Sequence, residues 1–171
     1  GTDTTLLDLG TGSGIIAITL ALELPASRIV AVERSPEALA IARDNLQRHQ
    51  VRTVELLQSD WFEVLPEQAV FDLIVSNPPY LAEDDPHLER DGIRHEPRSA
   101  LIAGPQGLDD LTLIARDART RLRSGGTLLL EHGYDQAAAV ARQLEALGYA
   151  DIRHAADLQG HPRVTAARWL P

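Results

Sequence analysis

The stretch LLDLGTGSGIIAI, residues 6–18, places an apolar strand directly before three glycines and an apolar helix. Gly10, Gly12 and Gly14 stand where the chain must turn sharply, and glycine also lets a ligand approach the backbone closely. A dinucleotide-binding loop has its third glycine three residues beyond the second, and that position here is Ile15. The spacing, with an acidic residue just before the loop, therefore favours a nucleoside cofactor that lacks a pyrophosphate.

Outward from this loop, apolar runs typical of buried strands alternate with segments whose apolar residues recur every three or four positions. The runs predict strands over 5–9, 28–33, 54–58, 71–76 and 126–132, and the intervening patterns predict helices over 13–24, 35–50, 107–124 and 136–148. Residues 149–155 and 163–170 indicate two further strands joined as a hairpin. The predicted fold class is α/β: a doubly wound, mostly parallel, seven-stranded sheet with a C-terminal antiparallel hairpin. Its fourth strand should lie beside its first.

Composition limits the classes of protein that remain. The chain has 171 residues, 44% of them hydrophobic, and no cysteine, which suits one globular domain in a reducing compartment. Neither a membrane-spanning run nor a leader is visible, so we expect a cytoplasmic protein that does not enter membranes. The net charge of -9 argues weakly against nucleic acid. Because a strand follows within four residues of Gly1, we expect residues 1–171 to be one domain whose N-terminal neighbour is missing.

Polar residues also follow the second and third predicted strands. Glu33 ends the second strand, where a carboxylate can accept both hydroxyls of a ribose. Asp60 and Trp61 follow the third strand and can supply an acceptor for an exocyclic amine and a flat surface for an adenine ring. Since ligands bind at the carboxyl ends of parallel strands, these features together predict a nucleoside site.

The fourth predicted strand stops abruptly at Asn77, Pro78, Pro79 and Tyr80. The prolines stiffen the backbone and remove two N–H donors, which leaves the Asn77 side-chain oxygen and the Pro78 carbonyl as acceptors beside the Tyr80 ring. This frame suits a planar group with an NH2. Two acceptors can orient the lone pair of such a nitrogen for attack on an activated methyl group. From the residues alone, an amide and an aromatic amine remain equally possible.

The order of DLGTGSG, Glu33, SDWF and SNPPY resembles class I S-adenosylmethionine-dependent methyltransferases. The downstream segments at 96–111, 125–133 and 163–169 narrow the resemblance to the protein-(glutamine-N5) methyltransferases that act on peptide chain release factors. It implies methylation of the glutamine in the Gly-Gly-Gln loop of a release factor, with S-adenosylmethionine as cofactor. The resemblance also implies a helical N-terminal domain that helps engage the release factor, and we expect residues 1–171 to lack it.

The resemblance also implies roles for particular residues. Cofactor binding falls to Gly10, Thr11, Gly12, Ser13, Gly14, Glu33, Asp60, Trp61 and Asn77. Substrate binding falls to Asn77, Pro78, Pro79 and Tyr80, with Asn77, Pro78 and Tyr80 as the catalytic set. No metal is expected, and the enzyme is expected to act as a monomer.

Two alternatives remain open: methylation of an adenine or guanine amine in DNA or RNA, and a non-catalytic nucleoside-binding module. A flipped base would require a basic channel and stacking aromatics, whereas aromatic residues are only 4% of this chain. An amide clamp has no use in a pure binder.

Other polar residues are further site candidates. The six histidines, which are His49, His87, His95, His132, His154 and His161, share no metal-ligand spacing. Glu131 and His132 can either line the site or support it. The segment 84–99 can close over a substrate or be an ordinary solvated loop, and Arg98 within it is given no role.

Overall fold

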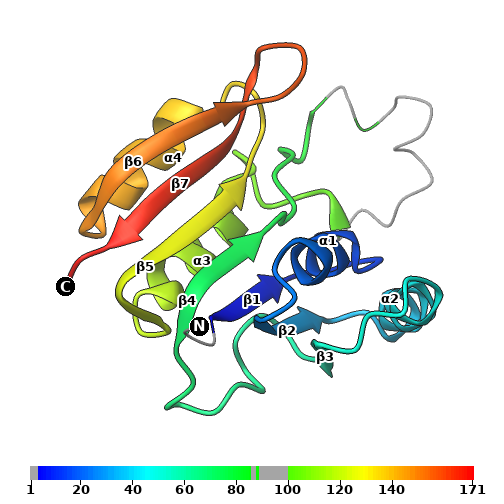
Figure 1. Ribbon diagram of the computed structural model, residues 1–171. Coiled ribbons are helices and arrows are strands. Elements are labelled where there is room, and N and C mark those ends of the chain that lie inside the picture. Colours follow the sequence, from blue (N-terminus) through cyan, green and yellow to red (C-terminus); the bar gives the residue numbers. More distant parts are fainter. Residues whose placement is uncertain (1–3, 86–87, 89–99) are drawn as a thin grey trace.

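The computed structural model describes residues 4–85, 88 and 100–171. These residues form one seven-stranded sheet in the order β3-β2-β1-β4-β5-β7-β6 (Figure 1). The strands are β1 (Thr5–Leu9), β2 (Arg28–Glu33), β3 (Val54–Gln58), β4 (Phe71–Ser76), β5 (Leu122–Glu131), β6 (Tyr149–Ala156) and β7 (Pro162–Trp169). The helices are α1 (Ile15–Glu23), α2 (Pro36–Arg48), α3 (Asp109–Ala118) and α4 (Ala137–Ala146).

The sheet has the predicted topology. β1 pairs in parallel with both β2 and β4, while β7 runs antiparallel to β5 and to β6. The α/β fold class, the terminal hairpin and the position of the fourth strand beside the first are therefore confirmed. Since the chain turns back across the sheet between β3 and β4, the carboxyl end of β1 lies at the topological switch point, where open parallel sheets bind ligands.

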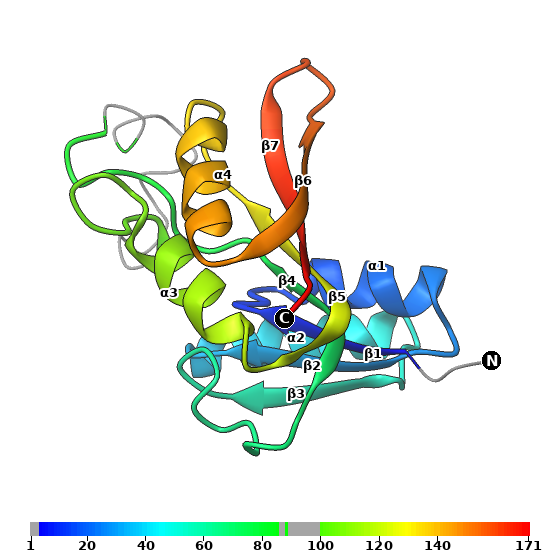
Figure 2. The ribbon, with the colours of Figure 1, turned by 90° about the vertical axis from the view of Figure 1, so that its left-hand side faces the viewer.

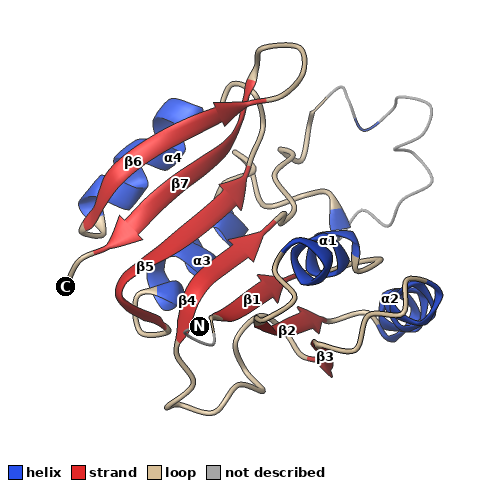
Figure 3. Cartoon of the chain, viewed as in Figure 1, coloured by secondary structure: helices blue, strands red, loops and turns tan. Residues whose placement is uncertain are grey.

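Helices cover both faces of the sheet, with α1 and α2 on one face and α3 and α4 on the other (Figures 1 and 2). Figure 3 shows the strands as the layer between them. Alternate residues of β1 point to opposite faces. Leu7 and Leu9 join the large core under α3 and α4, and Leu6 joins a smaller core with Ala17 of α1. Burial on both faces explains why β1 is almost continuously apolar.

The second helix begins as the sequence predicts. The Ser35 hydroxyl accepts a hydrogen bond from the Ala38 amide at 3.1 Å, Pro36 is the first helical residue, and Glu37 lies in the first turn. The Ser35 hydroxyl also donates to the Glu37 carboxylate at 2.8 Å. These contacts fix the direction in which the chain leaves β2, and with it the position of the residues between β2 and α2.

One helix is shorter than predicted. α3 ends at Ala118, so the prediction of helix over 107–124 is wrong for residues 119–124, and β5 begins at Leu122. The Phe71 amide donates to the Arg121 carbonyl at 2.8 Å, and Leu122 pairs with Phe71 and is buried in the core. Pairing with β4 thus overrides the helical periodicity. A register shift follows between Phe71 and Leu73, where β5 contains two glycines.

Among the helices of the described ranges, none is long and apolar enough to span a membrane.

Candidate functional site

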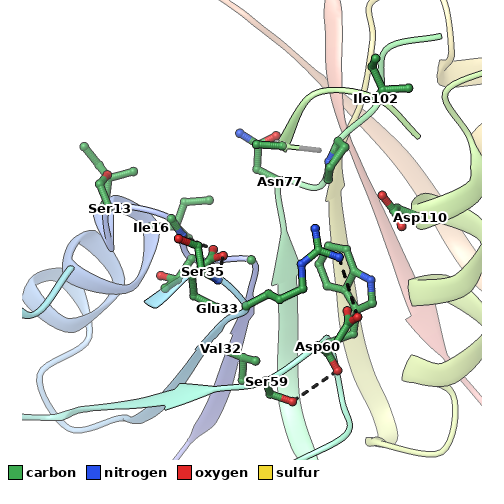
Figure 4. A pocket seen from close by; sticks show the side chains of 18 residues that line it. Ser13, Ile16, Val32, Glu33, Ser35, Ser59, Asp60, Asn77, Ile102 and Asp110 are labelled. Atoms are coloured by element: carbon green, nitrogen blue, oxygen red, sulfur yellow. Dashed lines mark hydrogen bonds and ion pairs between the residues drawn. The ribbon is translucent and has the colours of Figure 1, made fainter. Parts of the chain in front are cut away.

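A cavity of about 880 Å³ opens at the carboxyl ends of β1, β2 and β4. Of the residues predicted for the site, those that line it are Gly10, Thr11, Gly12, Ser13, Glu33, Asp60, Trp61, Asn77 and Pro79. Figure 4 shows Glu33, Asp60, Asn77 and Asp110 around one opening. Its size falls within the usual range of about 300–1,000 Å³ for pockets that bind small molecules. Residues from four separate parts of the sequence therefore meet at the switch point.

The glycine loop has the backbone that its sequence requires. Gly10, Gly12 and Gly14 have φ angles of 69°, 55° and 84°, which favour glycine. A Cβ atom at Gly12 would meet nothing within 4 Å, whereas one at Gly10 would lie 3.3 Å from the Trp61 ring. Gly12 therefore borders open space in the cavity, and Gly10 allows the indole to lie against the loop. Gly14 does not line the cavity; it precedes α1 and packs against Ala42 of α2.

Asp8, near the end of β1, stabilises the glycine loop through hydrogen bonds. Its Oδ2 atom accepts from the Thr11 hydroxyl at 2.5 Å and from the Ala17 amide at 3.1 Å. The side chain is fully buried, and within the described residues its Oδ1 atom has no hydrogen-bond partner. Burial raises the pKa of Asp8 to about 6, against the opposing effect of these two hydrogen bonds. Asp8 thus joins the loop to the start of α1 and carries one oxygen that no described residue satisfies.

Glu33 bridges the glycine loop and the start of α2. Its Oε2 accepts from the Gly12 amide at 3.0 Å, and its Oε1 accepts from the Ser35 amide at 2.9 Å. Each carboxylate oxygen has a further lone pair available, so the two backbone contacts orient the group without exhausting it. The side chain faces the cavity (Figure 4). The arrangement can accept two hydroxyl groups on neighbouring carbons.

The far wall of the cavity contains two polar residues that sequence reasoning missed. Arg34 follows the strand-ending carboxylate, and its Nη1 lies 3.8 Å from Asp60 Oδ2. Asp110, near the start of α3, also lines the cavity. Burial raises the pKa of Asp110, an effect that Arg34 partly opposes and Asp60 adds to. Arg34 could have been found from its position after a strand, but Asp110 has no local signal because only the fold brings α3 to this wall.

The Asn-Pro-Pro-Tyr segment starts from a fixed point, since the Ser76 hydroxyl donates to the Leu9 carbonyl at 2.8 Å. Asn77 is exposed and lines the cavity, and its side-chain amide makes no hydrogen bond with the described part of the chain. Pro79 lines the cavity as well, whereas Pro78 is buried and neither Pro78 nor Tyr80 is among the lining residues. The segment therefore offers a free amide beside the glycine loop.

Tyr80 turns toward the interior. It packs against the large core, and its hydroxyl lies 3.4 Å from Glu131 Oε1. Burial raises the pKa of Glu131. Of the two roles open to Glu131 and His132 from the sequence, lining the cavity does not hold, because neither residue is part of its wall. His132 is fully buried and contacts Gly133 and Thr165.

The remaining candidates lie away from the cavity or outside the described residues. Among the lining residues there is no histidine, so His49, His154 and His161 take no part in the wall. His87, His95 and Arg98, with most of the segment 84–99, are outside the described residues. In the described part of the chain, no group of three or more acidic or histidine side chains is arranged to hold a metal ion.

Comparison with known proteins places this site in context. The family described as "Methyltransferase domain" matches residues 1–161. The release factor glutamine methyltransferase of Salmonella typhimurium is 48% identical over 166 residues, which cover 97% of this chain and 60% of the relative. That of Pseudomonas aeruginosa is 48% identical over 165 residues, 96% of this chain and 59% of the relative. The chain thus spans about three-fifths of the length of these curated relatives.

Solved structures agree on the fold. A methyltransferase from Pyrococcus furiosus superposes with a TM-score of 0.74 at 18% identity, covering 99% of this chain and 76% of that one. TrmN from Thermus thermophilus gives a TM-score of 0.67 at 24% identity, covering 98% of this chain and 44% of that one. The glycine loop at the switch point, the cavity and the match over nearly the whole chain lead to one conclusion: this chain belongs to the methyltransferase-domain family.

Proposed function

We propose that this chain is the catalytic region of an S-adenosylmethionine-dependent enzyme that methylates the side-chain amide nitrogen of a protein glutamine, the one in the Gly-Gly-Gln loop of peptide chain release factors. The observation that carries the proposal is the exposed amide of Asn77, which borders the same cavity as Gly12 and Glu33. The names of the relatives from Salmonella typhimurium and Pseudomonas aeruginosa support the choice of glutamine.

The cavity has the chemistry that this cofactor requires. Glu33 presents two oriented acceptors for the ribose hydroxyls, and Asp60 presents an acceptor near Trp61 for an adenine amine. Gly12 leaves open space into which a cofactor can fit against the backbone. Bound there, S-adenosylmethionine would supply a methyl group activated by a sulfonium. The acceptor groups and the open space fit the cofactor, and we assign Gly10, Thr11, Gly12, Ser13, Glu33, Asp60 and Trp61 to its binding, while Gly14 shapes the turn into α1.

Asn77 and its neighbours would act on the acceptor amide. The Asn77 side-chain oxygen and the Pro78 carbonyl accept the two N–H groups of a substrate glutamine, which turns the nitrogen lone pair toward the methyl carbon. The cofactor, when bound, would supply its methyl carbon to this oriented nitrogen, and the nitrogen would then give up a proton. Because an alkylated amide nitrogen becomes strongly acidic, water can take this proton. The residues therefore contribute orientation more than acid–base chemistry.

The proposal places the enzyme in the cytoplasm, where release factors act, as a monomer that does not bind nucleic acid stably. The chain has 25 acidic and 16 basic side chains, and this acidic balance supports the absence of stable nucleic acid binding, because a phosphate backbone attracts basic proteins.

The test is radiolabelled methyl transfer from S-adenosylmethionine with four acceptors offered separately: a release factor, the same release factor with alanine at the Gly-Gly-Gln glutamine, RNA and DNA. We expect label on the unaltered release factor alone. If label appears on RNA or DNA and none appears on the release factor, the methyl acceptor is a base amine and the proposal of glutamine is wrong.

A further inference from the structure

The side chain of Gln136, the residue before α4, lies against the backbone that follows the Asn-Pro-Pro-Tyr segment. Its Nε2 atom lies 3.0 Å from the Tyr80 carbonyl, 3.2 Å from that of Gln106 and 3.3 Å from that of Gly107. An amide nitrogen carries only two hydrogens, so three acceptors share them. Three converging carbonyl oxygens require a hydrogen-bond donor at this point and exclude a carboxylate, which can only accept when it is ionised.

The orientation of the Gln136 amide is fixed from the other side. Its Oε1 atom accepts from the Gly133 amide at 2.7 Å, and the Gly133 carbonyl lies 2.9 Å from Nδ1 of His132. Since a carbonyl only accepts, Nδ1 must carry the hydrogen. Burial lowers the pKa of His132 and thereby favours the neutral ring, in which Nε2 is an acceptor. The hydroxyl of Thr165, 2.7 Å away, then donates to Nε2.

The Tyr80 carbonyl has little room to move. A Cβ atom built on Gly107, whose φ is 67°, would lie 2.2 Å from this oxygen, so only glycine allows the two backbones to approach so closely. The next residue is held as well, since the Leu81 amide donates to Leu101 at 2.8 Å and its carbonyl accepts from Ala103 at 3.1 Å. Gln136, which lies between β5 and α4, completes this anchor by donating from its side chain to the Tyr80 carbonyl.

The contacts that hold the Tyr80 carbonyl also limit the movement of the preceding residues, Asn77 to Pro79. Ser76 ties the start of the segment to β1, and Gln136 ties its end, so Asn77 and Pro79 are suspended between two fixed points. The prolines between them have fixed φ angles and transmit the positions of the ends to the Asn77 side chain. Gln136 itself does not line the cavity within the described residues.

We propose that Gln136 is a positioning residue: by holding the Tyr80 carbonyl it keeps the Asn77 and Pro78 acceptors in the geometry that an acceptor amide requires. This inference rests on the proposed function for its catalytic consequence. It assigns Gln136 a role in kcat and none in cofactor affinity.

The test compares Gln136→Met with Val140→Ala. Methionine keeps the length of the side chain and loses both the donor and the acceptor. Val140 is buried in α4, one turn after Gln136, and packs in the core instead of against the segment, so its truncation lowers stability without touching the Tyr80 carbonyl. Both variants are assayed below their unfolding temperatures, with release factor and S-adenosylmethionine. We expect Gln136→Met to lower kcat about 10- to 100-fold, as for misplaced catalytic groups, with unchanged affinity for S-adenosylmethionine. Val140→Ala should keep kcat.

Hydrogen exchange supplies a readout that does not depend on the substrate. Exchange at the Leu81 and Ala103 amides should be faster in Gln136→Met than in the wild type and unaffected in Val140→Ala. If the wild-type protein transfers no methyl group to the release factor, the proposed function is contradicted. The hydrogen exchange rates would then still test whether Gln136 holds the Tyr80 carbonyl. Unchanged exchange at both amides, or equal kcat in the two variants, would overturn the role of Gln136.

Discussion

Replacement of Glu33 by alanine tests the assignment of the ribose site. Glu33 contacts the Gly12 and Ser35 amides at 3.0 and 2.9 Å, and each of its oxygens has one lone pair left for a ligand hydroxyl. A hydrogen bond to a charged group contributes about 1.5–3 kcal/mol, so loss of two such bonds should cost at least about 3 kcal/mol. This corresponds to a rise of roughly 100-fold in the Kd for S-adenosylmethionine.

Titration calorimetry with S-adenosylmethionine measures the effect, with Glu23→Ala as the matched control. Glu23 is an exposed carboxylate at the far end of α1, so its removal changes the net charge equally without altering the cavity. Thermal unfolding should accompany the titrations, because Glu33→Ala also leaves two backbone amides without their acceptor. A Kd for Glu33→Ala equal to that of Glu23→Ala, in a folded protein, would refute the assignment.

Two further predictions concern the glycine loop. Gly12→Ala should fold, with a cost of about 1 kcal/mol for the positive φ, because its methyl group meets no protein atom, yet it should weaken cofactor binding by entering the cavity; unchanged affinity by calorimetry would mean that the cofactor lies elsewhere. For Asp8, the folded-state pKa of about 6 exceeds the ordinary value of 3.8, so the folded state binds the proton more tightly, and the stabilisation present below pH 4 is lost as pH rises through 6. Denaturant unfolding should show that Asp8→Asn lacks this loss, worth about 3 kcal/mol in the wild type, and parallel pH profiles of the two proteins would contradict the account of Asp8.

Much of the fold could be predicted from the sequence because the central strands are buried on both faces. The runs at 5–9, 28–33 and 71–76 coincide with β1, β2 and β4, since a largely apolar run of that length has few other structures available. The run at 54–58 coincides with β3, although β3 is an edge strand that is only partly buried. The segment after Ala118 could not be predicted in this way. Its leucine fits a helical pattern, and only pairing between Phe71 and the Arg121 carbonyl makes it a strand.

Some residues of the candidate site could likewise be predicted from the sequence, and others could not. Residues at or just beyond the end of a strand, such as Glu33, Asp60 and Asn77, could be predicted because the switch point gathers strand ends. Asp110 and Gln136 could not, since each is far in sequence from the residues that it faces. The inward turn of Tyr80 toward Glu131 also depends on packing against the core, which no local pattern encodes.

In the proposed function, Asn77 holds a glutamine amide for methylation. The most direct measurement is mass spectrometry of a release factor incubated with S-adenosylmethionine and either the wild-type protein or Asn77→Ala. The account predicts one methyl group on the Gly-Gly-Gln glutamine with the wild type. With Asn77→Ala it predicts a loss of orders of magnitude in rate, while affinity for S-adenosylmethionine stays within a few fold. Methylation of that glutamine at the wild-type rate by Asn77→Ala would contradict it.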